Sequence, residues 1–496
     1  MRTALLAAAA LLLGLASCKS DRQDAALQNG QCDTYVGVSV RFPAPETRAL
    51  PDDHNKLGEW QGRDVIKKIK VYVATTSNGA TTISSDQFTE ANFGGINNGI
   101  LAPNLAVEAK SGDKVKIYVV INDVNSKVTS ILDQKANTPA TFDEEFKKAV
   151  ATVAAIADVA KYDAEKDIVL MTNEKAPEDT TIAPNISKED AIGGKANRVE
   201  VRVSRVASRA IVTVDDQVKK TIEVKRSFTD AQGATTEQTT ATVTVKDIAY
   251  QVTGSALQFN VLEDRTNWKV AAPVYDFAPT SSTWATLATE AAGKMLFSDA
   301  EGYKAAIVKA DNTLDNVKAA LGEETFSKFV LPVTHAAGKY MKGNTTMFEI
   351  KATFTVDKID GAAPTGTDAQ TVYLGLSDGK FYSTLERAEA MDVNATSTSE
   401  KKQSAKEYKN GEMYYYIWLN PNVDYNDLTK TISESPTVRN QVYHAHITGF
   451  GEMGVADKDE IDPDTPLETK KTHLSVQLRV LPWTIHSYTV NLINRY

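Results

Sequence analysis

The last stretch of the chain, residues 473–496, alternates between apolar and polar side chains in two short runs. A period of two is typical of a β-strand with one buried face. Pro482 separates the runs, because proline cannot donate a backbone hydrogen bond inside a sheet. We therefore predict two strands, with apolar faces made by Leu474, Val476, Leu478 and Val480 in the first and by Tyr488, Val490 and Leu492 in the second.

Such strands would be an aggregation hazard on an open sheet edge, so we expect another surface to cover them. An acidic, proline-containing stretch, residues 457–472, precedes them. Its like charges repel one another, which predicts a flexible linker. A linker of this kind would let the two strands reach another molecule.

The composition indicates a globular chain with more than one core. At 496 residues and 42% hydrophobic, the length favours two or three domains. The net charge of -9 and a pI near 5.4 argue against a surface for nucleic acid or for anionic lipid. We therefore expect no nucleic-acid partner.

The chain begins with one arginine, an apolar run from Ala4 to Leu15, and small residues up to Cys18. The apolar run is too short to span a bilayer and is typical of a secretory signal. The motif Leu-Ala-Ser-Cys at 15–18 resembles a lipobox, which implies removal of residues 1–17, acylation of Cys18 and, with Lys19 next, the outer membrane. An ordinary signal peptide with a chance cysteine is the alternative.

Cys32 is the second of the chain's two cysteines. Acylation of Cys18 would rule out a disulfide between the two. We therefore expect packing and backbone ladders alone to hold the exported fold.

Near the N-terminus, residues 35–42 form a clear strand pattern with Val36, Val38, Val40 and Phe42 on one face. The proline-rich stretch 43–53 that follows predicts an exposed, extended loop. Arg48 is the one basic residue in this loop, and exposed loops are where proteases cut. The bond between Arg48 and Ala49 is therefore a candidate processing site, the alternative being a merely solvated arginine.

The body of the chain is dominated by strand patterns, which predict antiparallel β-sandwiches. A capping box at Thr141 and Glu144 predicts one helix, continued at helical spacing to Ala160 and packed across a sheet. A second helical pattern covers 314–329. The expected strands lie at 65–73, 115–121, 168–172, 199–206, 210–214, 221–228, 240–253, 346–356, 371–376, 413–419 and 442–447.

Motifs for chemistry are few. His444 and His446 form an H-x-H on a predicted strand, which is a fair start for a metal site, although two half-buried histidines are the alternative. The aromatic run 414–418 could stack on sugars or belong to a core. The sequence holds no phosphate loop, nucleophile elbow or zinc-protease motif, so we expect no enzyme and no cofactor.

Short motifs along most of the chain after Tyr35 resemble one family, the fimbrial shaft subunits of Bacteroidetes, known as the FimA and Mfa group of type V pilins. Within this group the resemblance is to the shaft subunits of short Porphyromonas fimbriae. The motifs are GEW at 58–60, KIYVVIND at 116–123, LPVTH at 331–335, YIWLNP at 416–421, VRNQVYHAHI at 438–447, VLPW at 480–483 and HSY at 486–488.

The resemblance implies a mainly β protein with two transthyretin-like antiparallel β-sandwich domains and one or two helices. It also implies a lipoprotein precursor in the outer membrane, a cut by an arginine-specific protease after Arg48, and polymerisation by strand exchange. The expected segments are a signal peptide at 1–17, a propeptide with a plug strand at 18–48, domains at 49–257 and 258–456, an acidic linker at 457–472 and donor strands at 473–496.

The same resemblance implies the partners. They are identical subunits in a head-to-tail fibre, fimbrial anchor and tip proteins, the arginine-specific protease, and host or bacterial surface ligands. The mature form would lie in cell-surface fimbriae. The acidic linker is shorter than the resemblance implies, which bears on the reach of the donor strands.

Simple energetics agree with this interpretation. Removing residues 35–48 would uncover a groove filled by four apolar side chains, whose burial contributes roughly 6–12 kcal/mol as an upper bound. Such a groove would recruit another strand, and a subunit that donates at one end and accepts at the other makes an open fibre. The alternatives are a tip or anchor subunit of the same family, or a surface glycan-binding lipoprotein.

Overall fold

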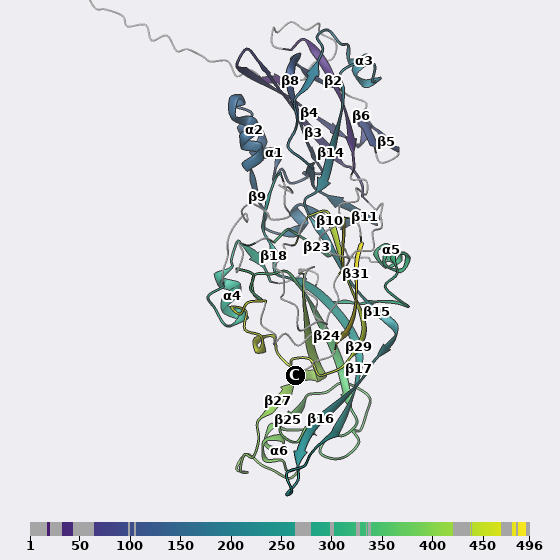
Figure 1. Ribbon diagram of the computed structural model, residues 1–496, viewed down its shortest axis with the longest axis vertical. Helices are drawn as coiled ribbons and strands as arrows, with labels where there is room; N and C mark the ends of the chain where they lie inside the picture. The colour runs from purple at the N-terminus through teal and green to yellow at the C-terminus, as the bar shows by residue number, and fades with distance from the viewer. Residues whose placement is uncertain are drawn as a thin grey trace, which may run out of the picture. The chain divides into compact units, whose positions relative to one another are not determined.

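The computed structural model confirms a mainly β protein (Figure 1). It describes residues 17–19, 32–42, 64–97, 100–103, 106–262, 279–297, 302–323, 328–333, 335, 339–419, 437, 439–467, 479–482 and 485–492.

The chain divides into two compact units. Unit 1 comprises residues 1–43, 66–151 and 171–204, and unit 2 comprises 44–65, 152–170 and 205–496. We expected the first domain to extend to residue 257, whereas this division falls after Ser204. The reason is that the strand from Ser208 pairs in parallel with the strand from Gln441, which ties it to the C-terminal half.

Unit 1 is built on one extended set of hydrogen-bonded strands. Among the described residues their order is β1-β4-β3-β8-β12-β14-β2-β6-β5, with β13 on β8 and β7 on β2. The bounds are β1 (Ser17–Lys19), β2 (Thr34–Arg41), β3 (Lys68–Ser77), β4 (Ala80–Thr89), β5 (Phe93–Asn97), β6 (Ile100–Pro103), β7 (Ala106–Ala109), β8 (Gly112–Ile121), β12 (Met171–Asn173), β13 (Thr180–Ile182) and β14 (Arg198–Arg205).

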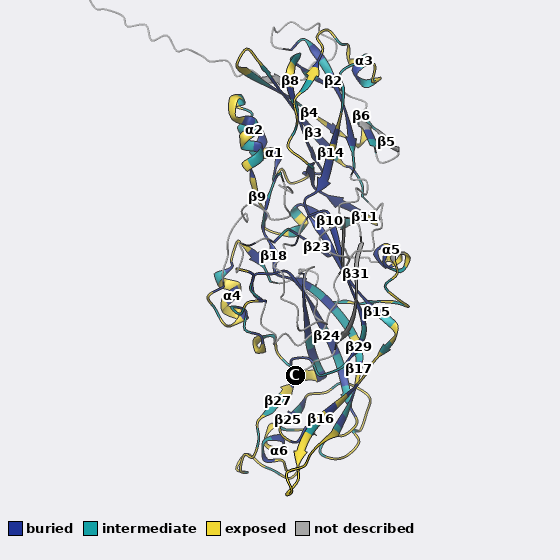
Figure 2. Cartoon of the chain, viewed as in Figure 1, coloured by how far each residue is buried: buried dark blue, intermediate teal, exposed yellow. Residues whose placement is uncertain are grey.

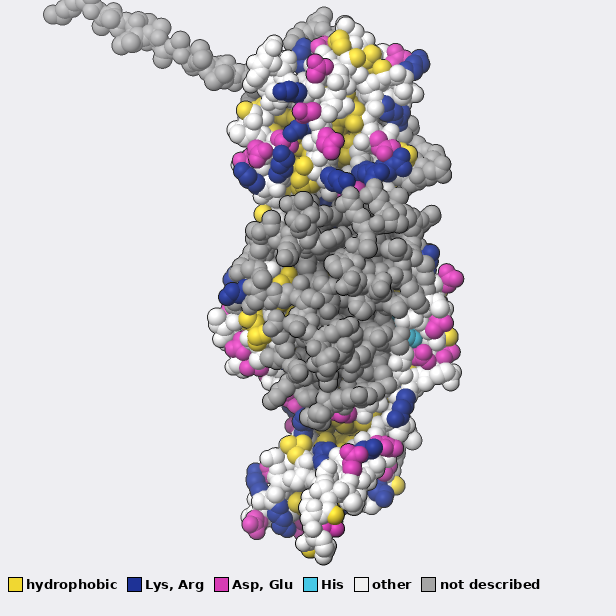
Figure 3. Space-filling model, in the orientation of Figure 1, with side chains coloured by type: hydrophobic (Ala, Val, Ile, Leu, Met, Phe, Trp, Pro, Cys, Tyr) yellow, Lys and Arg dark blue, Asp and Glu magenta, His cyan; other side chains and the backbone are white. Residues whose placement is uncertain are grey.

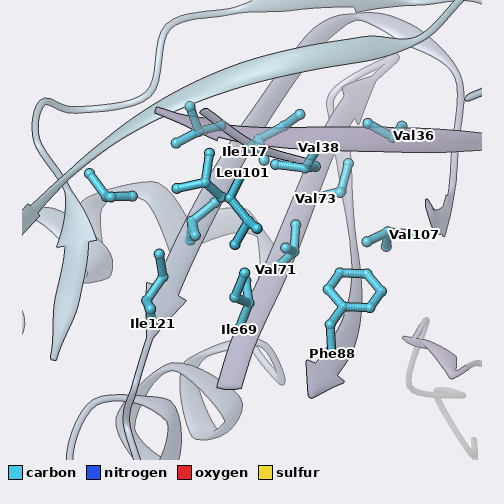
Figure 4. Close-up of a cluster of buried hydrophobic side chains, with 14 of the residues drawn as sticks. Val36, Val38, Ile69, Val71, Val73, Phe88, Leu101, Val107, Ile117 and Ile121 are labelled. Carbon is cyan, nitrogen blue, oxygen red and sulfur yellow. The ribbon is translucent and has the colours of Figure 1, made fainter. Parts of the chain in front are cut away.

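The apolar faces of these strands meet in one core. The close-up in Figure 4 places Val36 and Val38 of β2 in the same cluster as Val71 and Val73 of β3. Figure 2 shows β2 as a largely buried strand. The period-two pattern of residues 35–42 therefore predicted correctly both a strand and its buried face.

Three α-helices lie in the described part of unit 1: α1 (Thr129–Lys135), α2 (Phe142–Lys148) and α3 (Lys188–Ile192). The aromatic rings of Phe142 and Phe146 pack edge-on against Tyr118 of β8, at centroid distances of 5.0 and 4.8 Å, which confirms that this helix packs across a sheet.

The predicted length of this helix is wrong. Its backbone turns extended at Ala149, and Thr141 makes no side-chain capping bond. The residues that follow include the β-branched Val150, Thr152 and Val153, which favour extended backbone and outweigh the helical spacing of the apolar residues.

Unit 2 contains two larger sheets. In the first, β15 pairs with β22, β23 and β29, and β29 also pairs with β30 and β31; in the second the order is β16-β17-β24-β28, with β21 on β17. The bounds are β15 (Ser208–Lys219), β16 (Thr221–Thr229), β17 (Thr235–Thr253), β21 (Lys304–Ala305), β22 (Ile307–Lys309), β23 (Lys328–Val330), β24 (Met347–Val356), β28 (Glu412–Trp418), β29 (Gln441–Phe450), β30 (Arg479–Pro482) and β31 (Ile485–Leu492).

Smaller elements complete the described part of unit 2. They are β10 (Ala160–Asp163), β11 (Lys166–Val169), β18 (Ser255–Ala256), β19 (Gln258–Asn260), β20 (Met295–Leu296), β25 (Val372–Gly375), β26 (Phe381–Tyr382), β27 (Ala405–Tyr408), α4 (Trp284–Glu290), α5 (Leu314–Glu323) and α6 (Leu385–Ala390), while β9 (Val150–Thr152) spans the division between the units. The described residues thus hold more helices than the one or two expected, all of them short. The pairing is also mixed, since β15 and β29 run parallel.

The expectation that the fold contains no disulfide is not met at Cys32. The structure records it as disulfide-bonded, so the prediction of a fold without disulfides is wrong at this residue. Its sulfur also lies 3.7 Å from the hydroxyl of Ser84 on β4.

No helix in the ranges given above has both the length and the apolar character needed to span a membrane. Figure 3 shows basic and acidic side chains interspersed over the described surface of one face. Neither charge sign dominates that surface.

Candidate functional site

The most informative site is the position of β2 within unit 1. On one side β2 runs parallel to β14, with Val38 opposite Val199. On the other side it runs antiparallel to β7 and β6, with Tyr35 opposite Glu108 and Val40 opposite Leu101. Because β2 has neighbours on both sides, it is an interior strand; we call the position that it fills the β2 slot.

The side of the β2 slot that faces the core, which we call its floor, is apolar. Val36, Val38 and Val40 are exposed by 0, 2 and 0%. Phe42 is partly buried and packs against the same cluster. All four residues of the predicted plug strand therefore lie together on the core side of β2.

The N-terminal end of the slot is polar. The hydroxyl of Thr34 donates to the carbonyl of Ala183 at 2.8 Å and accepts from Asn197 Nδ2 at 2.9 Å and from the amide of Ile186 at 3.2 Å. Thr34 is fully buried, so these bonds satisfy a hydroxyl that would otherwise destabilise the core. This network fixes where the strand begins.

Asp33, one residue earlier, is held by two residues that lie between β7 and β8. It accepts hydrogen bonds from Lys110 Nζ at 2.8 Å and from the amide and hydroxyl of Ser111 at 2.6 and 2.9 Å. Burial alone would raise the pKa of the Asp33 carboxyl, but these hydrogen bonds outweigh it and hold the pKa below its ordinary value.

The outer face of the slot is closed at its middle by α3. A Cβ at Gly37 would lie 2.2 Å from the carbonyl oxygen of Ala191 on this helix. Glycine is therefore required for α3 to sit where it does, and any other residue at this position would displace the helix. Ser187 caps α3, its hydroxyl accepting from the amide of Asp190 at 3.1 Å.

The C-terminal end of the slot carries an ion pair. Arg41 binds Glu200 of β14 through two parallel bonds, Nε to Oε1 at 2.5 Å and Nη2 to Oε2 at 2.7 Å. The hydrogen bond from Arg41 holds the pKa of the Glu200 carboxyl below its ordinary value. Both side chains are about a third exposed, at 32 and 39%, so the pair sets register more than it adds stability.

Several predicted site residues fall elsewhere. Arg48 and Ala49 lie outside the described residues, as do Leu474, Val476 and Leu478. The backbone alone is described for Cys18 in β1, for Val480 in β30, and for Tyr488, Val490 and Leu492 in β31. Within its own chain β31 pairs in parallel with β29, from Ile485 opposite Val442 to Leu492 opposite Phe450.

The acidic stretch is ordered over its described part, 457–467, so the prediction of a flexible linker is wrong there. Asp457 and Glu460 form a capping box, and Trp284 Nε1 donates to the carbonyl of Ile461 at 2.8 Å. Leu467 is only 3% exposed. Lys406 pairs with Glu460, which offsets part of the repulsion that we expected to extend the chain, and Lys458 ties the stretch to Glu349.

His444 and His446 lie side by side on β29, and both are buried. His444 Nε2 and His446 Nδ1 are 2.7 and 2.8 Å from the hydroxyl of Thr213, and His446 Nε2 is 3.3 Å from Asp215. In the part of the chain described here, no group of three or more His, Cys, Asp or Glu side chains is placed to hold a metal.

We predict that His446 makes the chain less stable in mild acid. Burial lowers the pKa of His446 below its ordinary 6.5, although Asp215 partly opposes this. As the pH falls below about 6.5, the unfolded chain therefore takes up a proton that the folded chain resists, and the free energy of unfolding decreases. Urea titrations at pH 7.5 and 5.5 should show a smaller decrease for His446→Gln than for the unmodified chain. An equal decrease in both would contradict the prediction.

Three aromatic residues of the run on β28 are too deeply buried to form a sugar-binding platform. Tyr415, Tyr416 and Trp418 are exposed by only 3, 2 and 1%, and Trp418 Nε1 donates to the carbonyl of Lys342 at 2.8 Å. The core alternative is therefore the correct interpretation for these three residues, whereas Tyr414 is partly exposed.

Sequence patterns alone missed the polar and steric parts of the β2 slot. Glu200, Asn197 and α3 come from a segment far along the chain, and no local pattern links them to residues 34–41. The one available signal was Gly37, a glycine inside a strand pattern, which often marks a close backbone approach.

Comparison with known proteins finds similarity to fimbrial subunits. Residues 406–489 match the family model described as major fimbrial subunit protein type IV, fimbrillin, C-terminal. Two sequences named minor fimbrium subunit Mfa1, both from Porphyromonas gingivalis, are each 28% identical over 521 aligned residues, which cover 98% of this chain and 98% of theirs.

Among solved structures, a fimbrilin (fimA) of Porphyromonas gingivalis is similar at 14% identity and a TM-score of 0.42, over 94% of this chain and 99% of that one. The sequence matches run through β28, β29 and β31 and, in the Mfa1 alignments, nearly the whole chain. The chain is thus similar to fimbrial subunit proteins, through the fimbrillin C-terminal model over residues 406–489 and through the Mfa1 sequences over nearly its whole length.

Proposed function

We propose that this chain is a structural pilin, the repeating shaft subunit of an adhesive cell-surface fimbria. It is exported as a lipoprotein precursor, cleaved after Arg48 and polymerised head to tail by strand exchange between identical subunits. The observation that carries the proposal is the position of β2: the strand that a cut after Arg48 would detach is an interior strand of unit 1.

The energetics favour exchange after the cut. The three buried valines of β2 contribute about 1.5–3 kcal/mol each, or roughly 5–9 kcal/mol together as an upper bound. Such a sum is comparable with the whole stability of a domain. While β2 is covalently attached, it fills the slot at a high effective concentration. Once the chain is cut, β2 competes with a neighbour's strand on more equal terms.

The C-terminal residues 473–496 are the proposed donor, because they alternate as β2 does and are separated from the buried Leu467 by five residues. Insertion would restore both backbone ladders of the slot as well as its side-chain contacts. Anchor and tip proteins of the same fimbria and an arginine-specific protease are the further partners that this assembly requires.

The proposal is tested by the N-terminus and the form of the surface protein. Fibres sheared from cells should consist of subunits that begin at Ala49 by mass spectrometry. Fibres whose subunits begin at Cys18, or surface protein that is monomeric after cleavage, would contradict it. A tip or anchor subunit would be found at the fibre ends and in few copies, whereas a shaft subunit labels along the whole fibre.

We predict that Cys18→Ala blocks export to the cell surface and leaves an uncleaved precursor. The lipobox motif at 15–18 motivates this prediction, because a thioether at Cys18 would retain the precursor in the outer membrane. The sulfur of Cys18 can form a thioether or a disulfide but not both, so the lipid and a disulfide are mutually exclusive uses of it. Cys32→Ala is the matched control and should still yield acylated precursor. Normal fibres from Cys18→Ala would refute the lipoprotein route.

A further inference from the structure

We propose that unit 2 carries a binding site for a neutral saccharide, on one face of the sheet that contains β24 and β28. Four side chains form this site, which we call the Tyr414 ledge: Tyr303, Lys351, Glu412 and Tyr414. The role of the ledge in adhesion rests on the function proposed above, whereas saccharide binding by a single chain does not.

The strands determine where these side chains lie. Lys351 of β24 is opposite Tyr414 of β28, and Thr353 is opposite Glu412. Because side chains two residues apart in a strand share a face, the ammonium, the carboxylate and the phenol project together. Tyr303, immediately before β21, adds a second ring, whose centroid lies 6.4 Å from that of Tyr414. A site built on strands in this way is formed before its ligand arrives.

The same face of the sheet is open at the ledge and closed beyond it. One cross-strand pair further along, Glu349 and Tyr416 are exposed by only 5 and 2%. At the ledge, the side chains of Lys351 and Glu412 are 28 and 27% exposed, and both tyrosine rings are partly exposed. A ligand can therefore reach the two rings and the two charged groups, but not the covered residues beside them.

The charges of the ledge determine which class of ligand fits. Lys351 Nζ lies 3.3 Å from Glu412 Oε1, and the hydroxyl of Tyr414 donates to Glu412 Oε2 at 2.8 Å. Lys351 Nζ also lies 4.7 Å from the centroid of the Tyr303 ring. A cationic ligand would have to displace Lys351 from this ring, and an anionic ligand would have to separate Lys351 from Glu412. The ledge therefore favours a ligand without net charge.

The exposed surface of the ledge is of two chemical kinds. The tyrosine rings are apolar on their faces, whereas the ammonium can only donate hydrogen bonds and the carboxylate can only accept them. A purely apolar ligand would cover the ion pair without replacing its contact with water, which is unfavourable. The ligand therefore needs an apolar face together with hydroxyls that donate and accept. A pyranose ring combines these features, because C–H groups line its faces and hydroxyls surround its edge.

In a fibre of identical subunits, the ledge would recur in every subunit. A single shallow site binds weakly, because a ligand buries only part of its surface there. Linked copies raise the overall affinity by orders of magnitude when many saccharides stand on one surface. A weak, repeated site is therefore suited to adhesion along a fimbrial shaft.

Saccharide binding by a single, uncleaved chain tests the site. The chain with Arg48→Ala is used, so that the result does not depend on fibre assembly. The probes are an array of neutral oligosaccharides of galactose, glucose, mannose and N-acetylhexosamines, with sialylated and sulfated oligosaccharides beside them. Calorimetric titration then measures the affinity of the strongest neutral binder. Tyr414→Ala, and likewise Tyr303→Ala, should weaken this affinity about tenfold or more, as the loss of a central aromatic contact does.

Tyr373→Ala is the matched control. The hydroxyl of Tyr373 on β25 donates to Glu407 of β27 at 3.1 Å, a cross-strand bond of the same kind in another sheet of unit 2. Its replacement should leave the affinity unchanged. Glu412→Gln keeps the size of the side chain but removes a charged acceptor, so it should weaken binding severalfold. This variant keeps the proposal testable if Tyr414→Ala does not fold.

The outcomes separate the ledge from the function of the fibre. The assignment would be overturned if no neutral saccharide bound, if acidic saccharides bound more tightly, or if Tyr414→Ala and Tyr373→Ala had equal effects. These results would leave the proposed pilin function in place, provided that the cleaved chain forms fibres. A chain that binds a neutral saccharide through Tyr414 but never forms fibres would support the ledge and contradict the pilin function.

Discussion

Replacing Arg48 by alanine is expected to abolish fibre assembly and to leave a folded precursor. The expectation follows from the interior position of β2, because an uncut chain keeps Val36, Val38 and Val40 in their own core. A neighbour's strand would have to displace them against a strand that is held covalently in place. Electron microscopy should show no fibres, and mass spectrometry should show a chain that still contains residues before Ala49.

Arg48→Lys supplies the matched control. It keeps the positive charge of the loop but removes the site for an arginine-specific protease, so it should also fail to assemble. Adding a lysine-specific protease to the purified Arg48→Lys precursor should then restore fibres. Fibres of normal length from Arg48→Ala, with a new N-terminus elsewhere, would show that another bond is the processing site.

Where one period dominated a segment, the sequence predicted its structure well. Residues 35–42 alternate cleanly, and the structure has β2 at Thr34–Arg41 with the predicted face in the core. Residues 115–121 are nearly all apolar, and β8 is buried by the core on one side and by Phe142 and Phe146 on the other. In both cases local pattern and tertiary packing favour the same conformation.

Where two signals competed, the prediction failed. The helical spacing from Phe142 to Ala160 met a run of β-branched residues, and the helix ends at Lys148. The acidic residues of 457–467 predicted repulsion, yet in the fold Glu460 pairs with Lys406, Lys458 pairs with Glu349, and the indole of Trp284 donates to the carbonyl of Ile461. Such partners are distant in sequence, and only the folded chain brings them together.

In the candidate site, too, the sequence predicted some features and not others. Its apolar floor could be predicted from alternation, whereas its two ends and its steric limit could not. Asn197, Glu200 and Ala191 meet β2 because β14 runs parallel to it, and a parallel neighbour leaves no turn between the strands to reveal the pairing.

Deleting residues 473–496 is expected to abolish fibre assembly as completely as Arg48→Ala does. In this case the loss comes from the donating end of the subunit. The truncated chain keeps β2, Arg48 and the whole of unit 1, so it should be exported, cleaved and able to accept a strand. It carries no donor, and cleaved truncated protein alone should therefore give no fibres by electron microscopy. Because β31 pairs with β29 in the single chain, urea unfolding should first establish that both units of the truncated protein still fold.

Mixing experiments make this prediction sharper. A subunit that accepts but cannot donate should end a growing head-to-tail fibre, so mean fibre length should fall in proportion to the fraction of truncated subunit added. The matched control combines the truncation with Arg48→Ala: such a subunit can neither donate nor accept, and adding it should leave fibre length unchanged. If cleaved, truncated subunits formed fibres of normal length, or if both added proteins shortened fibres equally, the C-terminal residues would not be the donor.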